Sequence, residues 1–263
     1  MSTILDQIVQ KNRLHLQRSP DYRKDLDFII SERVRRHSFA EALSLESFNV
    51  IAELKKASPS KGLIRKDFNA ITLAATLMEN GAAALSVLTE PFYFRGSLVN
   101  LQLTSAVTDI PILRKDFIFD EIQIIEAVAF GADAILLIAA MLEPARLKQL
   151  LNFAHENGLD VLCEVHDENE LATVLDAGAK IIGINCRNLK TFEVDRSLTM
   201  KMLREIPDDK IKVAESGISN GEEMAELRHA GANAFLIGET LMRSPAPGVM
   251  LRKLLDDAKD AFQ

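Results

Sequence analysis

The segment FGADAILLI (residues 130–138) contains the pattern on which the fold prediction rests: a glycine, small residues and then a short apolar run. A glycine just past a helix adopts the left-handed conformation that ends the helix without straining a Cβ atom. The nearly continuous apolar run is typical of a parallel strand covered on both faces. Four other segments repeat the pattern: NGAAALSVL (80–88), NGLDVLCEV (157–165), AGAKIIGIN (177–185) and AGANAFLIG (230–238).

Three further apolar runs complete a set of eight expected strands: ESFNVIAEL (46–54), DIPILRKDF (109–117) and IKVAES (211–216). Helical patterns lie between strands, for example over residues 70–80, 120–130, 143–157 and 220–230. Eight strand–helix units predict an α/β fold, a single (β/α)8 TIM barrel over residues 49–263. Residues 1–48 are expected to form a helical extension packed on the barrel. A doubly wound open sheet is the competing architecture, but no GxGxxG motif follows the first strand.

The composition limits the classes of function. The 263 residues include 31 Lys and Arg against 38 Asp and Glu, for a formal net charge of −7. This balance argues against a nucleic-acid partner or an anionic-membrane surface, so an anionic ligand needs a local cluster of positive groups. No apolar run reaches the roughly 18 residues of a membrane span, and polar residues interrupt the first 19 residues. We therefore expect a cytoplasmic protein that is a monomer or a weak homo-oligomer.

The two cysteines, Cys163 and Cys186, form neither a CxxC metal pattern nor a disulfide framework. Strand alternation gives both the phase opposite to that of Glu164 and Asn185. They are therefore expected to face the helices as small buried residues.

The N-terminal region has two features of its own. Helical periodicity runs over residues 1–18, and Arg33, Arg35, Arg36 and His37 form a short basic run. We interpret the basic run as a solvated face, whereas the apolar positions of this region are candidates to cap the barrel or line its mouth.

Polar residues end the expected strands, where the active sites of such barrels lie. Alternation along the strands places a polar set on the inward face: Glu53, Lys55, Lys115, Glu164, His166, Asn185 and Arg187, with Glu215 at the end of the seventh strand. Burying charges costs several kcal/mol per ion unless they are paired or used in chemistry. We interpret the set as an active site, with a structural ion-pair network as the alternative.

The seventh and eighth loops, AESGIS (214–219) and LIGETLM (236–242), offer glycines and backbone N–H groups near helix starts. Barrels of this kind often hold a phosphate there. The alternative is that Gly217 and Gly238 only make tight turns.

Six motifs resemble those of the indole-3-glycerol phosphate synthase family: IAELKKASPSKG (51–62), LTEPFYFRGS (88–97), PILRKDFI (111–118), GINCRNL (183–189), VAESGI (213–218) and FLIGETLM (235–242). The resemblance covers essentially the whole chain. It implies a carboxy-lyase of tryptophan biosynthesis that uses neither a metal nor an organic cofactor. Its phosphorylated small-molecule substrate is 1-(2-carboxyphenylamino)-1-deoxyribulose 5-phosphate, which is converted to indole-3-glycerol phosphate, CO2 and water.

The resemblance also implies a role for each matched residue. Lys115 is the general acid that protonates the substrate carbonyl, Glu164 is the acid/base group of the dehydration, and Lys55 contacts the substrate carboxylate. Three residues orient the lysines and hold substrate hydroxyl and amine groups: Glu53, Asn185 and Glu215. The anthranilate-side wall is Ser58, Pro59, Phe94, Arg187 and Leu236, and the phosphate end is Ser216, Gly217, Gly238 and Glu239.

Glu239 departs from the family pattern, in which serine is common at this position. A carboxylate aimed at a phosphate repels it, so only the backbone N–H of Glu239 is carried over. The side chain is expected to point into solvent, favoured by the helix dipole.

Elementary chemistry suggests two further expectations. Burial in a low-dielectric pocket is expected to raise the pKa of Glu164, which suits an acid/base group. The loop KASPSKG (56–62) has the small and polar composition of a mobile lid.

Three rival functions remain to be weighed. Phosphoribosylanthranilate isomerase is the nearest enzyme, but its acid/base pair includes a cysteine at the end of strand one, where this chain has Glu53 and Lys55. A Schiff-base aldolase needs Lys115 deprotonated, whereas nearby glutamates hold it protonated. A catalytically dead barrel that acts as a binding module is expected to lose strand-end charges, and none is lost.

Overall fold

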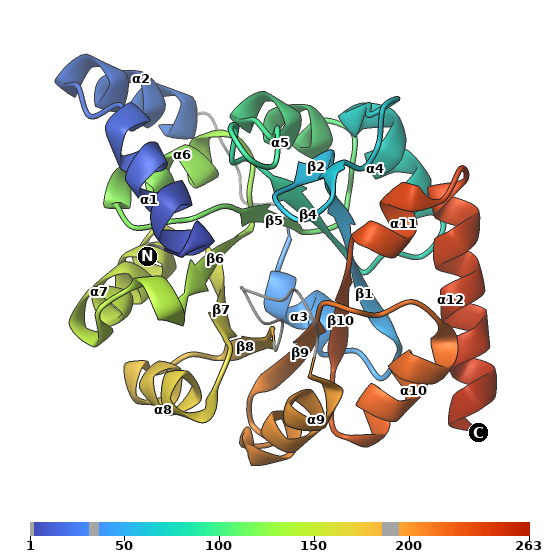
Figure 1. The fold of residues 1–263 in the computed structure, drawn as a ribbon. Coiled ribbons are helices and arrows are strands. Elements are labelled where there is room, and N and C mark those ends of the chain that lie inside the picture. Colours follow the sequence, from blue (N-terminus) through green and yellow to red (C-terminus); the bar gives the residue numbers. More distant parts are fainter. Residues whose placement is uncertain (1–2, 32–36, 186–194) are drawn as a thin grey trace.

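Eight parallel strands close into a barrel in the computed structural model, which describes residues 3–31, 37–185 and 195–263. The strands are β1 (Asn49–Leu54), β4 (Ala84–Leu88), β5 (Ile112–Lys115), β6 (Ala134–Ile138), β7 (Asp160–Val165), β8 (Ile181–Ile184), β9 (Ile211–Glu215) and β10 (Ala234–Ile237). β1 pairs with both β4 and β10, which closes the ring of strands (Figure 1). The predicted TIM barrel is therefore confirmed, with strand starts at or next to the expected positions.

Helices follow the strands and cover the outside of the barrel: α4 (Ala70–Glu79), α5 (Leu98–Ser105), α6 (Glu121–Ala129), α7 (Pro144–Glu156), α8 (Glu168–Ala177), α9 (Arg196–Glu205), α10 (Gly221–His229) and α12 (Pro247–Phe262). Two short elements, the 3-10 turn η1 (Ala139–Met141) and α11 (Glu239–Arg243), follow β6 and β10. Asn69, Ser97 and Asp120 each accept a backbone hydrogen bond in the first turn of the following helix. Such caps explain why these helices begin where they do.

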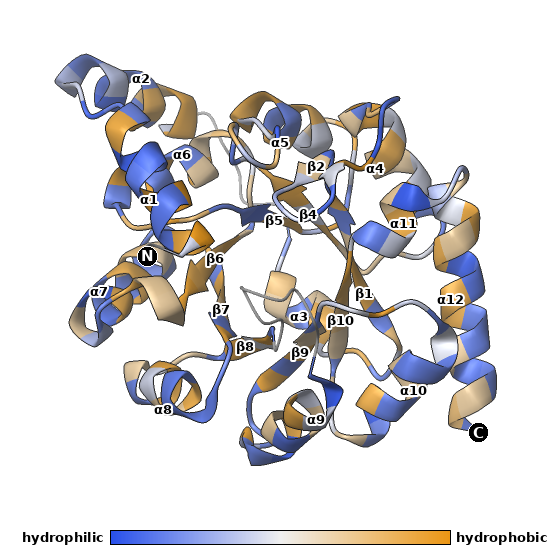
Figure 2. Cartoon of the chain, in the orientation of Figure 1, coloured by the Kyte–Doolittle hydropathy of each residue, from blue (hydrophilic) through white to orange (hydrophobic). Residues whose placement is uncertain are grey.

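The apolar core has two layers. An outer layer packs strands against helices and includes Phe235 and Cys163, and Figure 2 shows apolar strands ringed by helices of mixed polarity. The expectation that Cys163 faces the helices is confirmed, and burial raises the pKa of its thiol to about 12; Cys186 lies outside the described residues. An inner layer fills the barrel with side chains such as Ile51 and Leu162.

Three helices precede the first strand within the described residues: α1 (Ile4–His15), α2 (Pro20–Ser31) and α3 (Phe39–Leu43). Leu26 of α2 packs against residues of α6. The side chains of Phe39 and Leu43 are fully buried in the inner core, and the Phe39 N–H donates to Asp160 at the start of β7. α3 therefore plugs the amino end of the barrel and leaves the carboxyl end for a site. Of the basic run, His37 is half-buried, and Arg33, Arg35 and Arg36 lie outside the described residues.

The loop after β1 contains a short antiparallel pair, β2 (Ala57–Ser58) and β3 (Gly62–Leu63). Gly62 has a φ of +62°, which suits glycine at this turn. The expected lid is thus a hairpin at one rim of the barrel mouth, and its mobility stays a prediction.

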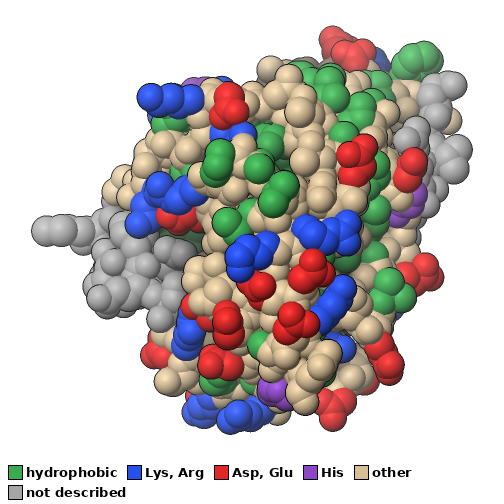
Figure 3. All heavy atoms as spheres, turned by 90° about the vertical axis from the view of Figure 1, so that its right-hand side faces the viewer, with side chains coloured by type: hydrophobic (Ala, Val, Ile, Leu, Met, Phe, Trp, Pro, Cys, Tyr) green, Lys and Arg blue, Asp and Glu red, His purple; other side chains and the backbone are tan. Residues whose placement is uncertain are grey.

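The face formed by α4, α10, α11 and α12 carries basic and acidic side chains close together (Figure 3). Lys253 and Asp257 of α12 pair one turn apart, as do Arg243 and Glu239 of α11. Both signs of charge therefore share this face. No helix in the described part of the chain is long and apolar enough to cross a membrane.

Candidate active site

A cavity of about 420 Å³ lies at the carboxyl ends of the barrel strands. Its lining includes the six residues of the expected catalytic set: Glu53, Lys55, Lys115, Glu164, Asn185 and Glu215. They come from the ends of five strands, β1, β5, β7, β8 and β9, and meet because alternate residues of each strand point toward the barrel axis. The structure thus places the expected set around one space large enough for a small molecule.

The Lys115 ammonium lies between two carboxylates. Its Nζ is 3.3 Å from Glu164 Oε2 and 3.8 Å from Glu215 Oε2. The side chains of Lys115, Glu164 and Glu215 are 15%, 5% and 1% exposed, so water screens these charges weakly. We refer to these three residues as the inner cluster.

Lys115 is held in its charged form. Burial by itself lowers the pKa of Lys115, but attraction to Glu164, Glu215 and Glu53 outweighs burial and raises the pKa above its ordinary value. Lys115 is therefore an ammonium at neutral pH and can donate a proton.

The two carboxylates of the inner cluster differ in their protonation. Burial alone raises the pKa of Glu164, but Lys115 and His166 outweigh burial and lower it below its ordinary value. For Glu215, burial and repulsion from Glu164 raise the pKa well above the ordinary value. The expectation that Glu164 has the raised pKa is therefore wrong. Glu215 therefore holds its proton more tightly than Glu164 does, because Glu215 is the more buried of the two and Lys115 lies closer to Glu164.

His166, at the end of β7, joins the inner cluster to the start of α8. Its Nε2 is 3.4 Å from Glu164 Oε1, and its Nδ1 is 3.0 Å from Glu170 Oε2. The backbone N–H of His166 also donates to Glu170 Oε2 at 2.8 Å. Burial lowers the pKa of His166, but the two carboxylates outweigh burial and raise it to about 10. Strand alternation had placed His166 on the inward face, yet the resemblance had given it no role.

Two glycines make room for the carboxylates. Glu53 Oε2 lies 2.5 Å from Lys55 Nζ, and a Cβ atom on Gly238 would overlap this Glu53 carboxylate. A Cβ atom on Gly183 of β8 would overlap the carboxylate of Glu215. Gly238 therefore borders the expected catalytic set as well as the expected phosphate end.

Asn185 and Ser216 contact each other across neighbouring strand ends, where Ser216 Oγ donates to Asn185 Oδ1 at 2.8 Å. Ser216 and Gly217 have φ values of +65° and +75°. The left-handed conformation costs a serine on the order of 1–3 kcal/mol, and such strain is common at functional sites. The strained turn holds Ser216 at the cavity.

The expected anthranilate-side wall is largely visible. Four of its members line the cavity: Ser58, Pro59, Phe94 and Leu236. Arg187, the fifth, lies outside the described residues. The ring of Phe94 lies 5.9 Å from that of Phe117, which also lines the cavity. Phe117 belongs to the RKDF motif, so the sequence did contain a signal that could have identified it as a cavity residue.

Glu90 holds the loop that carries Phe94. Its carboxylate is fully buried and accepts backbone N–H groups from Phe92, Tyr93 and Phe94 at 2.7–3.0 Å. Glu90 is therefore a structural residue of the LTE motif, and the wall position of Phe94 depends on it.

At the phosphate end, Ser216, Gly217, Gly238 and Glu239 all line the cavity, as does Arg243. Glu239 begins α11, and its Oε1 accepts from Arg243 Nε at 2.8 Å. Burial raises the pKa of Glu239, but Arg243 outweighs burial, with help from Lys61 and Lys55, and lowers it. The Glu239 side chain was expected to point into solvent; it is 31% exposed and pairs with Arg243 one turn along α11, so the expectation holds only in part. Sequence reasoning missed Arg243, a cation at this end of the cavity.

The N-terminal extension contributes an apolar wall. Ile4, Leu5 and Ile8 of α1 line the cavity. On the same helix, the Lys11 ammonium lies 4.4 Å from the centroid of the Phe92 ring. The sequence analysis had named the apolar positions of this region as candidates to cap the barrel or line its mouth, and those of α1 line the mouth. Periodicity alone shows that a helix is amphipathic without showing which surface it covers.

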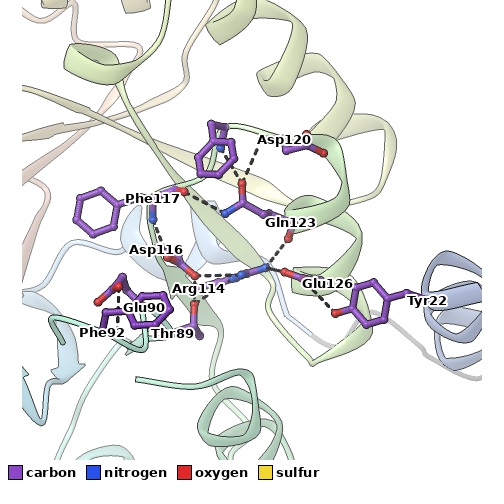
Figure 4. Close-up of polar contacts among 11 residues, drawn as sticks. Tyr22, Thr89, Glu90, Phe92, Arg114, Asp116, Phe117, Asp120, Gln123 and Glu126 are labelled. Atoms are coloured by element: carbon purple, nitrogen blue, oxygen red, sulfur yellow. Dashed lines mark hydrogen bonds and ion pairs between the residues drawn. The ribbon is translucent and has the colours of Figure 1, made fainter. Parts of the chain in front are cut away.

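A second polar network lies behind the inner cluster, between β5 and α6 (Figure 4). Arg114 Nη2 is 3.0 Å from Asp116 Oδ2, and its Nη1 is 3.0 Å from Glu126 Oε2. Asp116 also accepts from the Thr89 hydroxyl at 2.5 Å, and Glu126 accepts from the Tyr22 hydroxyl of α2 at 2.7 Å. We refer to these five residues as the outer network, which ties the N-terminal extension to the strand that carries Lys115.

No group of three or more His, Cys, Asp or Glu side chains in the described residues is arranged to hold a metal ion. Positive charge at the cavity comes from Lys55, Lys115, His166 and Arg243. Their arrangement provides a proton donor, two carboxylates in different protonation states and cations for an acidic ligand.

Comparison with known proteins gives a family match. A model of the family described as indole-3-glycerol phosphate synthase matches residues 5–254. Relatives named indole-3-glycerol phosphate synthase include one from Koribacter versatilis, 56% identical over 206 residues, with 78% of this chain and 79% of that protein covered. One from Campylobacter jejuni is 53% identical over 206 residues, covering 78% and 80%. One from Sulfurimonas denitrificans is 44% identical over 257 residues, covering 95% and 98%.

Solved structures share the fold at low sequence identity. The 3-hexulose-6-phosphate synthase from Salmonella typhimurium has a TM-score of 0.65 at 13% identity and covers 81% of this chain and 100% of that one. The thiamine phosphate pyrophosphorylase from Pyrococcus furiosus has a TM-score of 0.62 at 15% identity, covering 84% and 99%. These likenesses show the barrel fold alone.

Proposed function

Because the chain belongs to the indole-3-glycerol phosphate synthase family, we propose that the inner cluster of Lys115, Glu164 and Glu215 performs the proton transfers of that reaction. The enzyme cyclises and decarboxylates 1-(2-carboxyphenylamino)-1-deoxyribulose 5-phosphate to indole-3-glycerol phosphate, CO2 and water in tryptophan biosynthesis. The observation that carries the proposal is a buried ammonium between two carboxylates whose pKa values are shifted in opposite directions.

Ring closure needs an acid for the substrate carbonyl. The ring carbon that bears the carboxylate attacks the carbonyl carbon, and the Lys115 ammonium protonates the oxygen as the C–C bond forms. Loss of CO2 returns its bonding electrons to the ring and restores aromaticity. The raised pKa of Lys115 also argues against a Schiff-base aldolase, which needs the free amine.

Dehydration needs both an acid and a base. The hydroxyl formed in ring closure leaves as water after taking a proton, and the adjacent CH2 group loses one. Neutral Glu215 is placed to donate the first proton, and ionised Glu164 is placed to accept the second. The expected role of Glu215 in orienting the lysines thus extends to that of an acid.

The remaining cavity residues bind the substrate. Lys55, held by Glu53 at 2.5 Å, contacts the substrate carboxylate. The aromatic ring lies against Phe94 and Leu236, with Ser58 and Pro59 beside them, and Asn185 holds a hydroxyl or amine group. Arg187 is proposed for the same wall from the family resemblance alone. The phosphate lies at Ser216, Gly217, Gly238 and the backbone N–H of Glu239, with Arg243 nearby.

The direct test is to mix the purified protein with the carboxyphenylamino-deoxyribulose phosphate and follow indole fluorescence. Glu164→Gln and Glu215→Gln are each expected to lose most activity while they keep substrate binding. Full activity in either variant removes that residue from its proposed role, without changing the family assignment. A cytoplasmic location and a monomer or weak homo-oligomer are also proposed, and cell fractionation and sedimentation test them.

A further inference from the structure

The proposed reaction consumes one proton in every turnover. A carboxylate enters and neutral CO2 leaves, so charge balance requires one proton from solvent. After product forms, Lys115 and Glu215 have each given a proton and Glu164 has gained one. The inner cluster must therefore take up one proton before the next turnover. Yet Glu164 and Glu215 are only 5% and 1% exposed.

His166 and Glu170 form a line of groups that leads out of the inner cluster. Exposure of the side chains rises along this line, from 5% at Glu164 through 16% at His166 to 21% at Glu170. The two gaps are 3.4 Å, from Glu164 Oε1 to His166 Nε2, and 3.0 Å, from His166 Nδ1 to Glu170 Oε2. Nε2 therefore faces the Glu164 carboxylate while Glu170 holds Nδ1, which leaves Nε2 as the ring nitrogen that can exchange a proton with the inner cluster.

We propose that His166 is the proton relay that recharges Glu164, and through Glu164 the rest of the inner cluster, from solvent. The inference rests on the proposed role of Glu164. Glu164 first passes the proton that it gained in the dehydration to Lys115, 3.3 Å away. The His166 imidazolium then gives its Nε2 proton to Glu164 Oε1, which passes it on to Glu215, and the ring keeps its Nδ1 proton against Glu170. Once product has left, water in the cavity that His166 lines returns a proton to Nε2, so one solvent proton enters per cycle and none is left over.

The surrounding charges keep the proton on His166 until the inner cluster has lost one. His166 faces Glu164 of its own strand and Glu170 of α8, and both raise its pKa. On the far side of Glu164, Lys115 of β5 lies 3.3 Å away, and Glu215 of β9 lies 3.8 Å from Lys115. With a pKa near 10, His166 is charged at rest and ready to donate once the inner cluster has lost a proton. Glu170 fixes the ring by accepting from both its Nδ1 and the His166 backbone N–H.

The experiment compares His166→Gln and His166→Ala with the wild-type enzyme over pH 6–10.5, by indole fluorescence at saturating substrate. We expect kcat to fall about tenfold or more in both, within the range of lost proton-transfer catalysis, while KM changes little. Added imidazole is expected to restore activity to His166→Ala in proportion to its concentration. His155→Gln, a histidine on the exposed surface of α7, is the matched control and is expected to behave like wild type.

Other outcomes overturn the relay. A wild-type kcat in His166→Gln overturns it. A loss of kcat in His166→Ala that imidazole does not restore also overturns it, because that pattern indicates a structural role. If the His166 variants do not fold by circular dichroism, Glu170→Gln decides: the relay predicts a lower kcat whose alkaline limb moves to lower pH, and an unchanged profile contradicts it. Glu164→Gln separates the two proposals, because full activity there removes the role of Glu164 itself, whatever His166 does.

Discussion

Two neighbouring residues of one strand, Arg114 and Lys115, lie in buried ionic environments of different kinds. Arg114 points toward α6. There, Asp116 and Glu126 accept hydrogen bonds from the Arg114 guanidinium, the Thr89 and Tyr22 hydroxyls and the Phe117 N–H. Lys115 points into the barrel mouth, where Glu215 Oε1 has no hydrogen-bond partner among the described residues. On one face of β5, each carboxylate of the outer network therefore has several hydrogen-bond donors. On the other face, the inner cluster has a carboxylate oxygen without one in the described part of the chain.

The difference explains why one environment is structural and the other suits chemistry. In the outer network, each carboxylate has several donors, which fixes the charged groups in one arrangement. In the inner cluster, one ammonium faces two carboxylates, so their pKa values are driven apart and a proton is available to move. The structural ion-pair network considered as an alternative does exist, but on the opposite face of the strand.

The largest expected effect is on activity, at the inner cluster. Lys115→Met is expected to lower kcat by about 10³-fold or more, because it removes the general acid. Urea unfolding is expected to change less than for the loss of Arg114, because His166 still faces Glu164 and Glu215 holds its proton tightly. Indole fluorescence and circular dichroism measure the two effects. A folded and active Lys115→Met enzyme contradicts the assignment of Lys115 as the acid.

Substitution of the neighbouring residue, Arg114, is expected to lower stability much more than activity. Arg114→Met leaves Asp116 and Glu126 buried without their cation, which costs about 3–5 kcal/mol of unfolding free energy. Urea unfolding measures this loss, and the fraction that stays folded is expected to retain substantial kcat. If Arg114→Met is as stable as wild type, the outer network is not what holds β5 and α6 together.

Gly238→Val tests how closely the phosphate end and the catalytic set are joined. Its side chain would displace the Glu53 carboxylate, so kcat is expected to fall together with a rise in KM, by about 2 kcal/mol in kcat/KM. This differs from an effect on phosphate binding alone, which raises only KM. Gly178→Ala is the control: its Cβ atom would meet open space but its φ of +92° strains an alanine, so it is expected to lower stability while both kinetic constants of the folded enzyme stay unchanged.

The protonation of Glu215 gives a pH-dependent effect on stability. Its pKa in the folded protein lies above its ordinary value of 4.5, so the folded state holds the proton more tightly, and this contribution to stability is lost as pH rises above 4.5. Glu215→Gln cannot ionise and is expected to be more stable than wild type by about 1–2 kcal/mol at pH 8, with a smaller difference at pH 5. Urea unfolding at the two pH values measures this, and an equal difference at both contradicts a raised pKa.

The smallest effect is expected at the edge of the outer network. Tyr22→Phe removes one hydrogen bond to Glu126 and is expected to cost about 1 kcal/mol of unfolding free energy. Because burial and Glu126 raise the pKa of Tyr22 above its ordinary value, the wild-type phenol is expected to resist ionisation in alkaline solution. Ultraviolet titration of wild type against Tyr22→Phe checks this, and an ordinary tyrosine titration contradicts the contact.

The sequence by itself determined the barrel and the residues at its mouth. Glycine followed by an apolar run marks five of the eight buried strands, and alternation of period two decides that Glu53, Lys115 and Glu164 face inward. These are local properties of the backbone, so they can be deduced without knowing which strands are neighbours. Motif similarity then supplied the reaction.

Only the tertiary structure decided which charges meet. The pKa of Glu164 depends on Lys115, 49 positions earlier, and on His166, and that of Glu215 depends on Glu164. The α1 wall and the link from Tyr22 through Glu126 to Arg114 likewise depend on packing between elements. Electrostatic interactions act through space at a few ångströms, and the distance between two charges is set by the closed barrel and not by their spacing along the chain.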